Sequence, residues 1–253
     1  IMITERNKDM ILDITQMRER RERIQAEITT IQSSSLTEES FGRLQDLIDQ
    51  LEAIDIELEA EERRAERMLT ECDLGRRFAD RTFRNFDGNA FNAAYQTALD
   101  YATNFPENHG EGLLFTGNPG TGKTHLAAAI TNHIIGVHKV PVKFVSYVDF
   151  LESLKAGFSG KEKEDEVKRL NEIPLLVIDD LGKERTSEWS NAVLYRIVNM
   201  RYEHCLPVII TTNETISDLE KAVGEATVSR LLEMCKGIRM VGTDHRKASL
   251  RRN

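Results

Sequence analysis

The first 72 residues carry apolar side chains at heptad spacing. This period places them along one stripe of a helix. We predict two long helices, over 3–32 and 37–71, that fold back on each other as an antiparallel hairpin or coiled coil. Steps of four and three residues connect Ile3, Asn7, Met10, Ile14, Met17, Arg21, Ile24, Ile28 and Ile31 in a first stripe, and Leu44, Leu47, Leu51, Ile54, Leu58, Glu61, Ala65 and Met68 in a second.

The predicted hairpin is thin and acidic. It buries only a narrow stripe, so either it binds another chain or it serves as an intramolecular brace. Residues 1–72 hold 10 Lys/Arg and 18 Asp/Glu, which accounts for the whole formal net charge of −8 of the 253-residue chain. Residues 73–253 hold 24 of each kind. We predict a helical partner-binding region over 1–72 and a second domain over 73–253.

In the second domain, short apolar runs alternate with helical patterns. Strands are predicted at 113–116, 142–146, 175–178, 207–211 and 238–241. Helices are predicted at 90–104, 147–155, 189–201, 216–223 and 227–235, with another from residue 125 onward. This alternation predicts an α/β fold with a parallel sheet, right-handed crossovers and a ligand at the carboxyl ends of the strands.

A glycine-rich loop follows the first of these strands. It matches the phosphate-loop pattern at every fixed position and reads Gly117-Asn118-Pro119-Gly120-Thr121-Gly122-Lys123-Thr124. The glycines allow successive N–H groups to point into one bowl at the start of a helix. Lys123 is predicted to contact the β- and γ-phosphates of ATP, and Thr124 to bind Mg²⁺. We expect this loop and the adjoining His125 to bind the nucleotide.

Polar side chains end two further strands. Asp179 and Asp180 follow the apolar run at 175–178, and Asn213 follows Thr211-Thr212. Asp179 is predicted to hold Mg²⁺, and Asp180 to orient or deprotonate the attacking water. Asn213 is predicted to hold that water beside the γ-phosphate. With Lys123, these three residues form the predicted catalytic set of one chain.

A late helix carries Ser229-Arg230. Arg230 cannot easily reach the γ-phosphate of its own chain, so we predict an arginine finger that acts on a neighbouring subunit. The alternative is a surface arginine that forms a salt bridge.

Taken in order, these motifs resemble the AAA+ ATPases of the DnaC/DnaI-type replicative helicase loaders and, more distantly, the IstB transposition helper ATPases. The resemblance covers residues 74–253. It is carried by Arg77-Phe78 and Thr82-Phe83-Arg84-Asn85-Phe86, by GNPGTGKTHLAAAI at 117–130, by LLVIDDLG at 175–182, by Thr211-Thr212-Asn213, by Gly224-Glu225 with Ser229-Arg230-Leu231, and by Asp244-His245-Arg246.

The resemblance implies further roles. It places Phe86 near the adenine, and it implies single-stranded DNA contacts for Phe158, Ser187 and Trp189. Stacking of a base on Phe158 or Trp189 is physically reasonable, but each residue also fits a partly buried aromatic. Arg246 resembles a sensor-2 arginine.

Two departures from the family pattern stand out. Ala226 occupies a position where the family usually has Arg, which puts more weight on Arg230. The 137 residues from Gly117 onward accommodate the α/β core but lack a full helical lid.

The resemblance implies an ATP-dependent loader that places a hexameric replicative helicase on single-stranded DNA, with hydrolysis as a release switch. The hairpin is expected to bind the helicase, and the ATPase domains to self-associate across shared ATP. The alternatives are an IstB-like transposition helper on duplex DNA, and a nucleotide-gated scaffold with little hydrolysis. A duplex binder needs a broad basic face, which the neutral 73–253 region does not favour.

The remaining composition predicts a reduced cytoplasmic location. Cys72, Cys205 and Cys235 fit neither a disulfide framework nor a metal-site spacing. The sequence contains no apolar run of about 18 residues and no secretory leader pattern, so no membrane association is expected.

Overall fold

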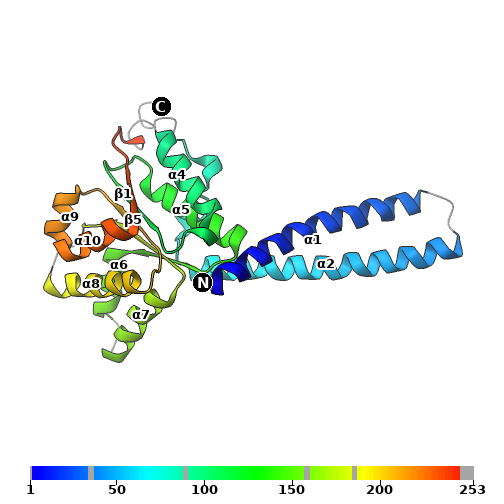
Figure 1. Cartoon of the computed structure of the whole chain (residues 1–253), viewed down its shortest axis with the longest axis horizontal. Helices are drawn as coiled ribbons and strands as arrows, with labels where there is room; N and C mark the ends of the chain where they lie inside the picture. The colour runs from blue at the N-terminus through cyan, green and yellow to red at the C-terminus, as the bar shows by residue number, and fades with distance from the viewer. Residues whose placement is uncertain (1, 34–36, 88–90, 157–159, 184–186, 246–253) are drawn as a thin grey trace.

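The computed structural model describes residues 2–33, 37–87, 91–156, 160–183 and 187–245, without the side chains of 2–15, 39 and 160–163. A long helical hairpin projects from an α/β body (Figure 1). The hairpin consists of α1 (Met2–Gln32) and α2 (Glu38–Glu71). The helices of the body are α3 (Arg76–Ala79), η1 (Phe83–Asn85), α4 (Asn92–Thr103), η3 (Phe105–Glu107), α5 (Lys123–His133), the π-helical turn η4 (Ile134–His138), α6 (Tyr147–Ala156), α7 (Gly160–Glu172), α8 (Glu188–Glu203), α9 (Ile216–Val223) and α10 (Glu225–Met234).

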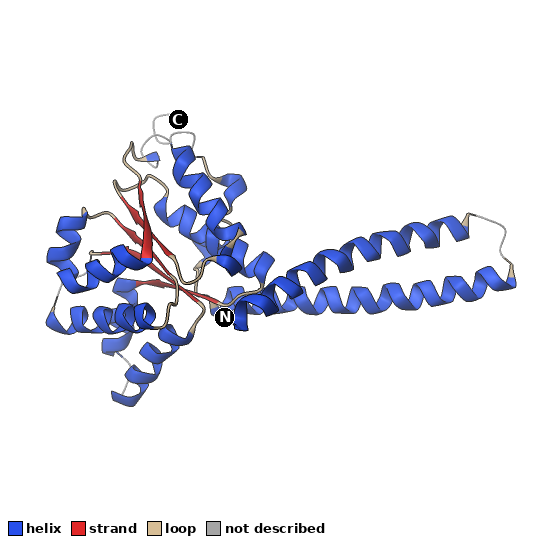
Figure 2. Cartoon of the chain, viewed as in Figure 1, coloured by secondary structure: helices blue, strands red, loops and turns tan. Residues whose placement is uncertain are grey.

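Five parallel strands form one sheet in the order β2-β3-β4-β1-β5. They are β1 (Gly112–Thr116), β2 (Val142–Ser146), β3 (Leu175–Leu181), β4 (Val208–Thr212) and β5 (Cys235–Arg239). The sheet lies between helices on both faces (Figure 2). The predicted α/β P-loop NTPase fold, preceded by N-terminal helices, is therefore confirmed.

Alternate residues of each strand pack into two separate cores. Leu113 and Phe115 of β1 face α4, α5 and η4, whereas Leu114 faces the helices α6 to α10. Leu175 and Val177 of β3 alternate in the same way with Leu176 and Ile178. Burial on both faces explains why the central strands read as unbroken apolar runs.

The strand β5 starts earlier than predicted. We expected it at 238–241, but it pairs with β1 from Gly112 opposite Cys235 to Thr116 opposite Arg239. The length and position of its partner determine the pairing, and the first residue of β5 directly follows α10. Apolar periodicity alone cannot reveal such a constraint.

The two heptad stripes meet along the part of the hairpin whose side chains are described. On α1, Ile24 and Ile28 are buried against Leu47 and Ile54 of α2. The polar seam position Arg21 forms an ion pair with Asp55 at 2.5 Å. The first seam positions, Ile3, Asn7, Met10 and Ile14, have side chains outside the described set.

The last two turns of α2 pack against the body. Ala65 and Met68 of the second stripe belong to the core cluster beneath α4 and α5. Just beyond the helix, the carbonyl oxygen of Cys72 accepts a hydrogen bond from the N–H of Phe144 in the edge strand β2 (2.9 Å). The hairpin is thus anchored to the sheet by apolar packing and by backbone pairing.

Within the described part of the chain, every helix is too short or too polar to cross a bilayer.

Candidate functional site

The glycine-rich loop curls tightly between β1 and α5. Gly122 has a φ of 99°, and a Cβ there would lie 2.6 Å from the ring of Phe86. Gly117 has a φ of 131°, and a Cβ there would lie 2.0 Å from the carbonyl oxygen of Met240. Only glycine fits both positions, because each combines a left-handed backbone with a close neighbour. The chain on either side thus determines the curvature of the loop.

Lys123 joins the loop to the ends of β3 and β4. The residue is 5% exposed, and its ammonium group donates to the carbonyl oxygens of Gly117 (2.7 Å) and Asn118 (2.8 Å) and to Oδ1 of Asn213 (2.7 Å). The amide of Asn213 donates in turn to Oδ1 of Asp180 at 3.0 Å. The other carboxylate oxygen of Asp180 pairs with Lys183 at 2.7 Å. Three of the predicted residues are therefore linked in one hydrogen-bonded chain.

Asp180 has a left-handed backbone that turns its side chain away from the strand pattern. Its φ is 58°, and the pairing register of β3 with β4 shifts between Ile178 and Leu181. The N–H of Asp180 donates to the hydroxyl of Thr211 at 3.0 Å. Such irregularities in a strand re-aim a side chain, here toward Asn213 and Lys183.

Asp179 lies deeper, between two threonines. Its Oδ1 accepts hydrogen bonds from Thr124 (2.9 Å) and Thr211 (2.6 Å), and the residue is 7% exposed. Burial raises the pKa of Asp179 above its usual value, and the two hydroxyl donors oppose that rise. A buried carboxylate next to a hydroxyl is an oxygen donor set of the kind that Mg²⁺ takes. The pair Thr124 and Asp179 therefore fits a magnesium site.

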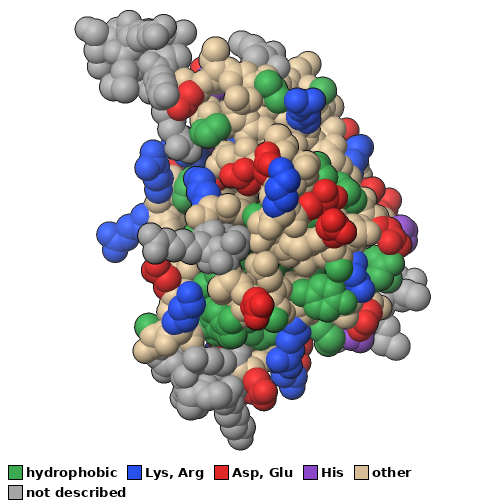
Figure 3. All heavy atoms as spheres, turned by 90° about the vertical axis from the view of Figure 1, so that its left-hand side faces the viewer, with side chains coloured by type: hydrophobic (Ala, Val, Ile, Leu, Met, Phe, Trp, Pro, Cys, Tyr) green, Lys and Arg blue, Asp and Glu red, His purple; other side chains and the backbone are tan. Residues whose placement is uncertain are grey.

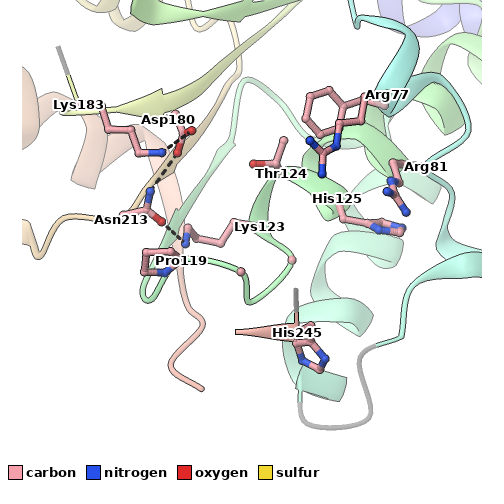
Figure 4. A pocket seen from close by; sticks show the side chains of 13 residues that line it. Arg77, Arg81, Pro119, Lys123, Thr124, His125, Asp180, Lys183, Asn213 and His245 are labelled. Atoms are coloured by element: carbon pink, nitrogen blue, oxygen red, sulfur yellow. Dashed lines mark hydrogen bonds and ion pairs between the residues drawn. The ribbon is translucent and has the colours of Figure 1, made fainter. Parts of the chain in front are cut away.

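A cavity of about 390 Å³ opens above the loop. Figure 4 shows its lining, with Lys123, Asn213, Asp180 and Lys183 at one end and His125 at the other. The lining is Arg77, Phe78, Arg81, Pro119, Gly120, Gly122, Lys123, Thr124, His125, Asp180, Lys183, Asn213 and His245. Basic side chains outnumber the single carboxylate in this lining. The charge, the volume and the glycine loop all fit a nucleoside triphosphate.

Some predicted nucleotide contacts support the loop from behind. Gly117 and Asn118 offer their carbonyls to Lys123, and Thr121 donates to the carbonyl of Asn118 at 2.9 Å. Phe86 lies outside the cavity lining. Its ring packs edge-on against His125 at 5.2 Å and stacks on Tyr95 at 5.8 Å. In this structure Phe86 shapes the loop, and its predicted place near an adenine stays a prediction.

Five lining residues were not predicted as site residues: Arg77, Phe78, Arg81, Lys183 and His245. Arg77 and Arg81 come from the segment before the core. His245 comes from the segment after β5, where its N–H donates to the carbonyl of Gly120 at 3.1 Å. Lys183 could have been suspected, because it lies three residues after Asp180.

Arg230 lies on α10 and is not part of the lining of this cavity. Its guanidinium lies over the rings of Tyr195 (4.9 Å) and Tyr202 (5.8 Å). It donates from Nε to Asn199 at 2.8 Å and from Nη1 to the carbonyl of Ala226 at 3.0 Å. These contacts hold the guanidinium in one orientation, and none of them is a salt bridge to a carboxylate.

The predicted DNA contacts are partly described. Ser187 caps α8, accepting from the N–H of Ser190 at 3.1 Å, so its hydroxyl has a structural role. Trp189 is 39% exposed, and the ammonium of Lys155 lies 5.3 Å from its ring centre. An exposed indole beside a cation can stack on a base. Phe158 and Arg246 lie outside the described residues.

The sequence is similar to those of several known proteins. A family model described as "IstB-like ATP binding protein" matches residues 23–252. YqaM, an uncharacterized protein of Bacillus subtilis (strain 168), is 31% identical over 67% of this chain and 57% of its own length. The replicative helicase loader DnaC of Escherichia coli (strain K12) is 31% identical over 54% of this chain and 56% of its own. The matches thus span little more than half of these two relatives.

Solved structures give the same result. The crystal structure of the DnaC helicase loader aligns with a TM-score of 0.58 and 30% identity, over 66% of this chain and 99% of that one. The crystal structure of DnaI aligns with a TM-score of 0.58 at 22% identity, over 70% of this chain and 98% of that one. At this low identity, the alignment with DnaI shows a shared fold and nothing further. The chain therefore belongs to the family of IstB-like ATP-binding proteins and carries the AAA+ fold of the DnaC-type loaders.

Proposed function

We propose that this protein is an ATPase that loads a hexameric replicative helicase onto single-stranded DNA. The observation that carries the proposal is the hydrogen-bonded chain from Lys123 through Asn213 to Asp180, above a glycine loop that fits phosphate. The similarity to DnaC supports the choice of helicase loading among the tasks of AAA+ proteins. ATP hydrolysis would release the protein from its partner.

Each residue of the site has a task in this proposal. Lys123 would exchange its amide and carbonyl partners for phosphate oxygens, and Asp180 would orient the attacking water. Asn213 would keep its hydrogen bond to Asp180 and so hold that carboxylate in place. When bound at Thr124 and Asp179, Mg²⁺ would supply charge neutralisation at the phosphates.

Arg230 would complete the site of a neighbouring subunit. Its position outside its own cavity fits a finger that acts in trans. Tyr195, Tyr202 and Asn199 already orient the guanidinium, so little conformational entropy would be lost when the finger engages. ATP would then bridge two chains, and self-association would depend on it.

The hairpin over 1–72 would bind the helicase. It projects from the body, and its outer surface carries the exposed apolar side chains Phe41 (63%) and Ile56 (66%). Exposed apolar groups on a projecting helix are common at protein contacts. Residues 73–253 would form the ATPase domain.

The test uses the full chain and the helicase hexamer of the same genome. We expect a complex by size-exclusion chromatography with light scattering, and ATP-dependent unwinding of a protein-coated fork. Lys123→Ala should abolish ATP binding and loading. Binding to a transposase but not to the helicase, with a steep salt dependence on duplex DNA, would favour an IstB-like helper instead. On the face in Figure 3, basic and acidic side chains are interspersed, so this face offers no broad basic surface among its described residues.

A further inference from the structure

Two arginines from the junction after the hairpin line the nucleotide cavity. Arg77 lies on the short helix α3, and Arg81 lies two residues beyond its end. Figure 4 shows both on the side of His125, across Thr124 from Asp180 and Lys183. Among the described residues, neither guanidinium has a hydrogen-bond or ion-pair partner. Two unpaired guanidinium groups at one end of a cavity are available to bind an anion.

The backbone of these arginines is fixed to the helix that starts the nucleotide site. The amide of Asn132, on α5, donates to the carbonyls of Phe78 (3.3 Å), Ala79 (3.1 Å) and Arg81 (2.7 Å). The ring of His125, also on α5, contacts the carbonyl of Thr82 at 3.0 Å. One helix thus positions both the phosphate loop and the arginine segment.

The two ends of the cavity differ in how far their charged side chains are paired. The carboxylate of Asp180 is engaged by Lys183 and Asn213 at the far end. Arg77 also borders a second cavity whose lining includes carboxylates. Within the nucleotide cavity, no carboxylate other than Asp180 belongs to the described lining, so the arginine end carries positive charge that is not offset there. A polyphosphate is the ligand that would neutralise it, since the loop beside it is itself built for phosphate.

The same segment connects the nucleotide site to the hairpin. The helix α2 ends at Glu71 and α3 begins at Arg76, so four residues separate them. The first of these, Cys72, is tied to β2 through Phe144, and it is buried in the core cluster. A displacement of α3 would therefore occur close to the point where the hairpin is anchored to the body.

We propose that Arg77 and Arg81 bind the polyphosphate of the nucleotide in cis and thereby order the junction between hairpin and ATPase body when ATP is bound. This inference rests on the proposed nucleotide site. It adds a regulatory role to that site. Nucleotide binding would change the order of the junction next to the hairpin of the same chain, without the participation of a neighbouring subunit.

The first test is nucleotide affinity, measured by titration of the full chain with a fluorescent ATP analogue. Arg77→Gln with Arg81→Gln should weaken binding about tenfold or more, because charge-assisted hydrogen bonds are lost. Arg84→Gln is the matched control, since Arg84 is an exposed arginine of the same segment outside the cavity. The thermal midpoint without nucleotide should stay at the wild-type value, because neither arginine has a partner to lose.

The second test is hydrogen exchange over residues 72–82 with and without ATP. Wild type should exchange more slowly with ATP, and the double variant should not respond at saturating ATP. Wild-type affinity in the double variant, with binding abolished by Lys123→Ala, would overturn the inference but leave the proposed site intact. Retained binding in Lys123→Ala would instead contradict the proposed site. Lost affinity with retained protection would overturn the coupling to the junction.

Discussion

Thr211 is the residue on which the geometry of both acids depends, and Thr211→Val is the sharpest test of the site. The hydroxyl donates to Asp179 at 2.6 Å and accepts from the N–H of Asp180 at 3.0 Å, and the residue is fully buried in β4. Valine keeps the shape of the side chain and removes only these two hydrogen bonds. The substitution therefore changes hydrogen bonding without opening a cavity.

The expected loss of stability follows from the two bonds. A hydrogen bond to a charged group contributes about 1.5–3 kcal/mol, and a buried N–H left without a partner costs about 1–3 kcal/mol. The added methyl group recovers about 0.8 kcal/mol. We expect the free energy of unfolding to fall by about 3 kcal/mol in total.

Thr212→Val is the matched control. Thr212 is equally buried in the same strand, but its hydroxyl bonds only backbone groups, the carbonyl of Leu181 at 2.7 Å and the N–H of Glu214 at 3.1 Å. Loss of the Thr212 hydroxyl should lower the free energy of unfolding by about 1–2 kcal/mol, since both of its hydrogen bonds are between neutral groups. Urea denaturation of both variants measures the difference.

Activity gives a second comparison between the two threonines. Release of the Asp180 N–H should displace its carboxylate, so Thr211→Val should lower kcat for ATP hydrolysis about tenfold or more, and Thr212→Val should not. Equal stability losses together with wild-type kcat in Thr211→Val would refute the reasoning.

Three further predictions concern other parts of the body. Arg201→Met should lower the free energy of unfolding by about 3 kcal/mol or more in urea denaturation, because this buried guanidinium donates to four backbone carbonyls; a loss under 1 kcal/mol, roughly one ordinary bond, would contradict this. Burial lowers the pKa of His138, so the unfolded chain takes up its proton first, and stability should fall as pH drops below about 6.5; denaturation at pH 7.5 and 5.5 should show a smaller fall in His138→Asn. Tyr195→Ala should reduce the ATPase rate of the assembled protein but not its ATP affinity, because it loosens Arg230; Tyr195→Phe should retain the rate, and a normal rate in the alanine variant would remove the positioning role.

The helices and strands that could be predicted from the sequence are those with a strong periodicity of apolar side chains. The central strands were recognisable because both of their faces are buried, as for Leu175 to Ile178. The helix α7 was missed because it is rich in charge, and Val167 and Leu170 are the only buried residues among its described side chains. The four-residue α3 is too short to show any period.

The site divides in a similar way. Lys123, Asp179, Asp180 and Asn213 could be grouped from the sequence, because the carboxyl ends of parallel strands meet at one edge of the sheet. The paired hydrogen bonds of Thr211 were not predictable, since they depend on the irregular backbone at Asp180. Arg77 and Arg81 were not predictable either. Their approach to the loop depends on Asn132, which is more than fifty residues away in sequence.

The two ends of the cavity differ in how far they can respond to a ligand. At the Lys123 end, Asn213, Asp180 and Lys183 already satisfy one another, so a phosphate there replaces existing bonds with new ones and moves little backbone. At the Arg77 end, the described guanidinium groups of Arg77 and Arg81 have no partner to give up, and α3 is only a single helical turn. Binding of a polyphosphate should therefore alter the structure mainly at the arginine end. The arginine end is also the end joined to the hairpin. A structural change caused by nucleotide binding there would therefore be transmitted toward the hairpin.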